Sequence, residues 1–261
     1  ICENSATSQL EVLVPAPGYT LTAIAHAPVS GTNIPAPTQF DDGVSVGVPI
    51  GFTFPFYGNS YSSLNISCNG FVSFTTTGSG CCTGELIPTT GFQGINNVIA
   101  LAWDDLAVHN GGSISYFNLT APNRFVVNFT GVPFYSNGPG AVTGQIILYA
   151  TGLIEIHSTA IDASGQSATQ GIENATDNEA TVVPGRNFAS WTATNDAYRF
   201  TPDSYSVTWS PATNLSASNI LNPVFGPVPA GSYPLTVTAT HPVTGCASSQ
   251  TITVTANPAI S

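Results

Sequence analysis

The fold class is visible in the stretch Gly51-Phe52-Thr53-Phe54-Pro55-Phe56-Tyr57-Gly58-Asn59, where phenylalanines recur at every second position and a Gly-Asn turn signal follows. Successive side chains of a strand point to opposite faces, so this alternation is typical of a half-buried β-strand. The same period recurs in Leu64/Ile66/Cys68, Phe125/Val127/Phe129, Ile154/Ile156, Leu235/Val237 and Ile252/Val254. No stretch keeps helical spacing. The sequence therefore predicts an all-β fold dominated by a large antiparallel β-sandwich.

A change in composition near residue 203 divides the chain. The part before it is rich in Phe, Asn and Gly, whereas the part after it carries short Thr and Val strands such as Leu235-Thr236-Val237-Thr238. The tail is short for an immunoglobulin-like sandwich of about 100 residues, so we expect its first strands to be missing. The predicted domains are an N-terminal extension over 1–16, a large sandwich over 17–202 and a small immunoglobulin-like sandwich over 203–261.

The charge balance excludes several classes of function. The chain has 14 acidic residues against 3 Lys and Arg, which gives a formal net charge of −11 at pH 7. Nucleic acids and anionic membranes both require clustered basic side chains, so neither is an expected partner. No apolar run approaches the roughly 18 residues of a membrane helix, so no membrane insertion is expected. Charged residues are only 7% of the composition, which leaves hydroxyls and amides to solvate the surface.

The cysteines suggest an oxidising compartment. There are five, with no Cys/His spacing typical of a zinc site, in a chain that begins with Ile1 and reads as a mature or excised protein. Cys68 enters the Asn69-Gly70 turn, and Cys81 and Cys82 lie in the loop after the next predicted strand. We therefore predict a disulfide between Cys68 and one member of that pair.

Several motifs resemble a known family. They are Gly51-Phe52-Thr53-Phe54-Pro55-Phe56-Tyr57-Gly58, Ser67-Cys68-Asn69-Gly70-Phe71-Val72-Ser73-Phe74, Asn97-Val98-Ile99-Ala100, Trp103-Asp104-Asp105-Leu106, Asn123-Arg124-Phe125-Val126-Val127 and Gly171-Ile172-Glu173-Asn174-Ala175. In this order they resemble the nidogen-like β-sandwich modules of bacterial surface proteins and secreted proteases. The tail is similar to short immunoglobulin-like or PKD-like repeats of Bacteroidota secreted proteins. The resemblance implies secretion or a cell-surface location, and Cys68 stands where the family usually has Ser.

Candidate metal and catalytic groups gather at one predicted strand end. Asp104 and Asp105 precede His109, and carboxylate oxygens are the ligands that Ca²⁺ prefers. We name Asp104 and Asp105 as the candidate calcium ligands and expect no other cofactor. Neighbours on a strand face opposite ways, so only one of the two can face a given partner. No nucleophile, hydrolase or nucleotide motif is present, so we predict no catalytic residues and no enzyme.

Aromatic side chains offer an alternative function. Phe134, Tyr135, Trp191 and Tyr198 lie in loop-like sequence, where ring platforms for sugars are often built. The chain could therefore be a carbohydrate-binding accessory module of a secreted enzyme. By the same alternation Glu155 and His157 are expected to project away from the core and face solvent.

Sequons mark candidate glycosylation sites. The tripeptide Asn-X-Ser/Thr occurs at Asn65, Asn118, Asn128, Asn174 and Asn214. Asn65 and Asn128 alternate with apolar residues, so both are expected to face solvent.

The N-terminal extension suggests a mode of association. Leu10, Val12 and Val14 alternate in a segment that the large sandwich does not need. Added as a strand, they could complete the tail domain of the same chain or of the next copy, with Cys2 and Cys246 placed to lock the joint. We therefore predict a non-enzymatic extracellular structural or adhesive protein, a surface fibre subunit or adhesin fragment. Its expected partners are other copies of itself, neighbouring surface proteins or glycans.

Overall fold

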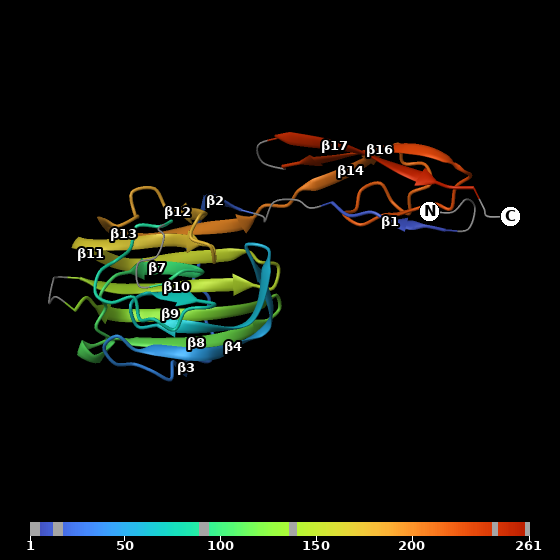
Figure 1. Cartoon of the computed structure of the whole chain (residues 1–261). Helices are drawn as coiled ribbons and strands as arrows, with labels where there is room; N and C mark the ends of the chain where they lie inside the picture. Colours follow the sequence, from blue (N-terminus) through green and yellow to red (C-terminus); the bar gives the residue numbers. More distant parts are fainter. Residues whose placement is uncertain (1–5, 13–17, 89–93, 136–139, 242–244, 259–261) are drawn as a thin grey trace. The chain divides into compact units, whose positions relative to one another are not determined.

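The computed structural model describes residues 6–12, 18–88, 94–135, 140–241 and 245–258 (Figure 1). The chain divides into two compact units, one formed by 18–202 and the other by 1–17 together with 203–261. The N-terminal segment therefore groups with the C-terminal tail and not with the unit that follows it directly in sequence. Each unit is described by itself below.

The larger unit is an antiparallel β-sandwich, which confirms the predicted fold class. One layer has the strand order β3-β8-β9-β10-β11-β13-β2 and the other the order β12-β11-β7-β6-β5-β4. The elements are β2 (Tyr19–Ile24), β3 (Ile34–Pro35), β4 (Val44–Phe56), β5 (Asn59–Ser67), β6 (Phe71–Ser73), β7 (Val98–Trp103), the short 3-10 helix η1 (Val108–Asn110), β8 (Ser113–Thr120), β9 (Asn123–Pro133), β10 (Ala141–Tyr149), β11 (Ile154–Glu173), β12 (Ala180–Val182) and β13 (Ala189–Pro202).

Strand β11 belongs to both layers. Its first half pairs with β10 and β13, and its last residues pair with β7 and β12. The register with β13 jumps between Ala163 and Ala168, and Gly165 inside this gap has a φ of +79°. Such a break in the ladder bends a strand, so one continuous strand can turn the corner between the two layers.

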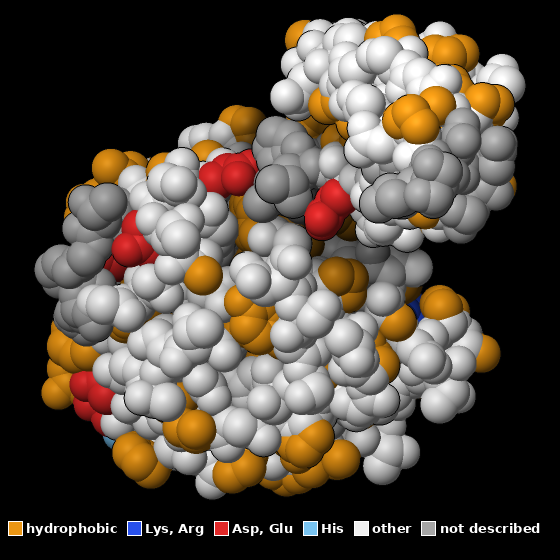
Figure 2. Space-filling view, turned by 45° about the vertical axis from the view of Figure 1, so that its right-hand side comes forward, with side chains coloured by type: hydrophobic (Ala, Val, Ile, Leu, Met, Phe, Trp, Pro, Cys, Tyr) orange, Lys and Arg blue, Asp and Glu red, His pale blue; other side chains and the backbone are white. Residues whose placement is uncertain are grey.

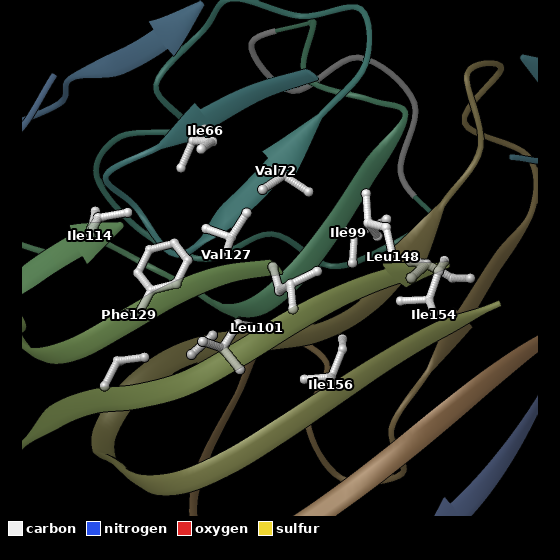
Figure 3. Close-up of a cluster of buried hydrophobic side chains, with 14 of the residues drawn as sticks. Ile66, Val72, Ile99, Leu101, Ile114, Val127, Phe129, Leu148, Ile154 and Ile156 are labelled. Atoms are coloured by element: carbon white, nitrogen blue, oxygen red, sulfur yellow. The ribbon is translucent and has the colours of Figure 1, made fainter. Parts of the chain in front are cut away.

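The core lies between the two layers. Figure 3 shows Ile66, Val72, Ile99 and Leu101 from one layer with Ile114, Val127, Phe129, Leu148, Ile154 and Ile156 from the other. All ten are almost completely buried, and Ile66, Val127, Phe129, Ile154 and Ile156 belong to the predicted alternating runs. Burial of each such side chain stabilises the fold by about 1.5–3 kcal/mol.

Glu155 and His157 correct a prediction, because both are buried and neither faces solvent. Their side chains do leave the sandwich core, but the segment 25–33 between β2 and β3 covers that face. The Ala27 N–H donates to His157 Nδ1 (3.2 Å), so Nε2 carries the proton and donates to Glu155 Oε2 (3.3 Å). Alternation gives the direction of a side chain on its strand, and a covering segment decides its exposure.

The sequons Asn65 and Asn128 give a second correction of the same kind. Both are buried, and both amide nitrogens are engaged, that of Asn65 with Thr76 O (2.6 Å) and that of Asn128 with Asn33 Oδ1 (2.8 Å). Asn174 is also buried, whereas Asn118 and Asn214 are exposed. The Asn118 amide donates to Ile50 O. An N-linked glycan is attached through the side-chain amide nitrogen of Asn. Because this nitrogen is buried and hydrogen-bonded in Asn65 and Asn128, the folded chain has no room for a glycan at either residue.

The smaller unit has two thin layers. One is the sheet β14-β16-β17 and the other is the pair β1-β15. The strands are β1 (Ser8–Gln9), β14 (Ser206–Ser210), β15 (Val224–Phe225), β16 (Gly231–Thr240) and β17 (Ala247–Ala256). Its core is built around Trp209, Phe225 and Leu235, and the N-terminal Leu10 belongs to it.

Candidate functional site

Asn69 is the centre of the polar site in the larger unit. It is fully buried in the turn between β5 and β6, where its Nδ2 donates to Asp42 Oδ1 (2.8 Å) and to Ser79 O (3.3 Å). Its Oδ1 accepts the backbone N–H of Leu106 (2.9 Å). One amide therefore ties together three loops, 40–43, 79–84 and 104–106, which are far apart in sequence.

Gly70 lets this turn approach the neighbouring strand. Its φ is +84°, and a Cβ at this position would lie 2.2 Å from Ala102 O. Its own carbonyl accepts the N–H of Leu101 at 3.0 Å. The Asn-Gly pair therefore forms more than a hairpin turn, since Asn holds the loops and only Gly fits beside β7.

The loop that carries the cysteine pair is held at several points. Trp103 Nε1 donates to Gly80 O (3.0 Å), and Ser67 Oγ donates to Ser79 O (2.6 Å). Gly84 leaves no room for a side chain, because a Cβ there would be 2.0 Å from Ser167 O. These contacts place Cys81 and Cys82 beside the end of β7.

Asp42, Cys81, Cys82 and Asp105 form what we call the acidic–cysteine cluster. One ligand atom from each of the four side chains lies within 4.8 Å of the others. Asp42, Cys81 and Asp105 are half-buried and Cys82 is exposed, so solvent reaches the group. Cys81 and Cys82 are joined by a disulfide.

The disulfide predicted for Cys68 is wrong. Cys68 is a buried thiol whose Sγ donates to Thr38 O at 3.5 Å, and burial raises its pKa to about 11. It continues the inward alternation of Leu64 and Ile66 into the core between the layers. The cysteine loop instead packs on the outer side of the same sheet, against Phe71 and Trp103. Cys81 and Cys82 bond to each other, and Cys68 is a free thiol. Cys2 and its predicted link to Cys246 lie outside the described residues.

The structure separates the two predicted calcium ligands. Asp104 turns inward, where its carboxylate accepts hydrogen bonds from the backbone N–H groups of Asp105 (2.8 Å) and Ser167 (3.0 Å). Its oxygens therefore satisfy backbone donors. Asp105 turns outward into the acidic–cysteine cluster. Burial, and then the neighbouring charges of Asp42, Asp41 and Asp104, raise its pKa to about 6. Two carboxylates, not an oxygen cage, face this site.

The buried Glu85 is expected to make the stability of the larger unit depend on pH. It is 8% exposed, and burial raises its pKa from 4.5 to about 7. The folded state thus holds a proton that the unfolded state releases, so this group reduces stability as pH rises from 4.5 through 7. Glu85→Gln is expected to stabilise the fold by on the order of 1 kcal/mol at pH 8 and by little at pH 4. Urea unfolding of both chains at the two values measures this, and an equal difference at both pH values would rule it out.

The N-terminal segment fills a groove in the smaller unit. Residues Ser8 and Gln9 pair with Phe225 and Val224. Beyond them the N–H of Leu10 donates to Pro223 O (3.0 Å) and that of Val12 to Leu221 O (3.1 Å). Leu10 is 6% exposed within the core, and Val12 packs against that core. Val14 lies outside the described residues.

The proposed ring platform is not assembled. Phe134 is buried in the core of the sandwich, and Trp191 is buried with its Nε1 donating to Ala168 O (3.0 Å). Arg186 covers the Trp191 ring at 4.7 Å. Tyr198 is half-buried, which leaves Tyr135 as the exposed ring of the four.

The family called NIDO related matches residues 18–211, which is well over half of the chain. The chain belongs to the NIDO-related family. The match covers the larger unit and continues through β14 of the smaller one. It confirms the nidogen-like resemblance, and this module type is non-catalytic. Membership indicates an extracellular or cell-surface protein with a structural or adhesive role. No curated protein and no solved structure matches the chain.

Within the described residues, no helix has the length and apolar character needed to span a bilayer.

Sequence reasoning missed Asn69 and Asp42 as parts of a site. Both stand in short turn motifs, Asn69-Gly70 and Asp41-Asp42-Gly43, which predict local turns. The positive φ of Asp42, +55°, agrees with such a turn. Their meeting depends on the order of strands in the sheet, which no local motif carries.

Proposed function

We propose that this NIDO-related chain is a subunit of an extracellular structural or adhesive assembly, joined by exchange of its N-terminal strand. The supporting observation is that Leu10 lies in the core of the smaller unit and Val12 packs against it, with main-chain hydrogen bonds to Pro223 and Leu221. A strand that is continuous with the opposite end of the sequence can be supplied by its own chain or by a neighbour. Both arrangements make the same contacts.

The energetics favour keeping the groove filled. A buried aliphatic side chain contributes about 1.5–3 kcal/mol, and each unmade main-chain hydrogen bond in the groove has a cost of its own. Closure within one chain has the advantage of a high effective concentration. The residues between strand and sandwich include Pro15 and Pro17, which restrict the conformations that closure can use. Exchange is therefore expected where copies are concentrated, as on a surface.

Exchange between copies would extend an assembly. A strand from one copy and a groove on the next are different surfaces, so the contact is heterologous and propagates unless it closes into a ring. The exposed surface fits non-ionic contacts, since most of the face in Figure 2 is uncharged and acidic side chains appear at separate places. Neighbouring copies are thus held by backbone pairing and apolar burial, not by charge.

The test is deletion of residues 1–12 followed by rescue in trans. We expect the truncated chain to lose thermal stability in its smaller unit and to recover it with an excess of the 1–12 peptide. The same peptide carrying Leu10→Asp and Val12→Asp is the matched control and should not restore it. Loss of a strand with one buried and one half-buried side chain predicts a cost of about 2–5 kcal/mol.

Polymerisation is measured separately by sedimentation of the full chain over a wide concentration range, and after refolding at high concentration. Oligomers that form in the full chain and not in the truncated chain support exchange. A full chain that remains monomeric throughout would show that the strand acts within one chain alone.

A further inference from the structure

We propose that the acidic–cysteine cluster is a redox-gated zinc site, which binds the ion through Cys81, Cys82, Asp42 and Asp105 after the Cys81–Cys82 bridge is reduced. The proposal is independent of strand exchange, because it uses the larger unit and no residue of the N-terminal strand.

The geometry fits a single tetrahedral ion. With Zn–O near 2.0 Å and Zn–S near 2.3 Å, the ligand atoms of a tetrahedron lie about 3.3–3.8 Å apart. The four side chains already hold one ligand atom each within 4.8 Å of one another. After reduction the two sulfurs are no longer bonded and can move apart, while the carboxylate oxygens of Asp42 and Asp105 approach them, which brings the four ligand atoms to the spacing of a tetrahedral shell.

The donor set selects the metal. Two thiolates and two carboxylates match the sulfur and oxygen ligands of zinc, whereas Ca²⁺ takes six to eight oxygens. Two further carboxylates lie nearby: Asp104 is already occupied by the N–H groups of Asp105 and Ser167, and Asp41 lies 3.8 Å from His109 Nδ1. A calcium cage therefore cannot be completed from the predicted pair.

The scaffold around the group is fixed before any ion arrives. Asn69 orients Asp42 through the 2.8 Å bond to its Oδ1, and the same amide holds the loops of Asp105 and of the cysteines. Trp103 anchors the cysteine loop at Gly80. Such outer contacts orient ligands and raise metal affinity about 10–100-fold.

The Cys81–Cys82 disulfide controls whether the cluster can bind zinc. While Cys81 and Cys82 are bonded to each other, neither offers a thiolate, and two carboxylates remain. Two equivalents of a small thiol supply the electrons and protons: the bridge becomes two thiols and the reductant becomes its disulfide. Zinc then displaces the two thiol protons as it binds. Cys82 is exposed, so a reductant can reach the bridge.

The experiment compares oxidised and reduced full-length chain under argon, each incubated with zinc and desalted before metal analysis. We expect about one zinc per reduced chain and none above background in the oxidised chain. Cobalt titration of the reduced chain should give the absorption of a tetrahedral thiolate site. This comparison uses one sequence, so it holds even where a variant fails to fold.

Variants identify the ligands. The double change Cys81→Ser and Cys82→Ser should abolish uptake, and Asp105→Asn should weaken it by more than the roughly 10–100-fold of an outer-shell loss. Cys246→Ser is the matched control and should bind like the parent chain. Equal zinc uptake by oxidised and reduced chains, or by the double serine variant and the parent, would overturn the proposal.

Discussion

Asn69→Ala is expected to lower the free energy of unfolding of the larger unit by about 3–5 kcal/mol. The change leaves the Leu106 N–H without its acceptor and removes the amide donor to Asp42, while the Ser79 carbonyl keeps the Ser67 hydroxyl as a donor. Asn69 is fully buried, so water cannot replace these bonds without opening the three loops. A buried polar group left unpaired costs about 1–3 kcal/mol, which sets the size of the effect.

Chemical denaturation of the parent and variant chains measures this loss. Asn59→Ala is the matched control, because Asn59 is an exposed Asn at the start of β5, directly after the turn that follows β4. We expect the control to change stability by no more than about 0.5 kcal/mol. Similar losses in both variants would show that Asn69 acts only as a turn residue.

Arg199→Leu is expected to destabilise the larger unit by about 2–4 kcal/mol, because it leaves a buried charge without its partner. Arg199 donates from Nε (3.0 Å) and Nη2 (2.7 Å) to Glu155 Oε1, while Tyr149 donates to Glu155 Oε2 at 2.8 Å. Adding Glu155→Gln to this variant removes the stranded charge, so the double variant should recover part of the loss. A double variant less stable than Arg199→Leu would contradict this account.

The Glu155 carboxylate is also expected to make the stability of the larger unit fall in acid. Burial alone would raise the pKa of Glu155, but hydrogen bonds from His157, Arg199 and Tyr149 hold it at about 2, below its ordinary 4.5. Its contribution is therefore complete above pH 4.5 and lost as pH falls toward 2. Glu155→Gln should flatten the stability curve over this range, as unfolding measured at pH 5 and pH 3 would show.

Much of the fold could be predicted because it depends on local patterns. The period-two alternation in Phe125/Val127/Phe129 and in Ile154/Ile156 marks residues of the sandwich core, of which Figure 3 labels Val127, Phe129, Ile154 and Ile156. Alternation is a property of the strand itself, so it survives whatever the strand pairs with. The Leu10 and Val12 pattern predicted a strand here; the strand of the structure is Ser8–Gln9, and Leu10 and Val12 follow it with main-chain hydrogen bonds to Pro223 and Leu221.

The errors have a common physical origin. Glu155, His157, Asn65 and Asn128 all lie on the outer side of a strand, as alternation requires, yet other segments of the chain cover them. The pairing predicted for Cys68 failed because nearness in sequence does not tell which face of a sheet a loop returns to. Which segment covers the outer face of a strand, and which face of a sheet a loop packs on, depend on contacts between distant segments. Local periodicity does not encode these contacts.

By itself the sequence determined the all-β class, the inward residues of the main strands and the weakly charged surface, because these follow from side-chain period and composition. Only the tertiary structure decided that Asn69 gathers three loops, that Cys81 bonds Cys82 beside Asp42 and Asp105, and that the first strand seats against the last domain. Apart from the bond between the neighbouring Cys81 and Cys82, those contacts join residues tens to hundreds of positions apart. Their free energy exists only once the sheets have paired, so no local pattern could specify them.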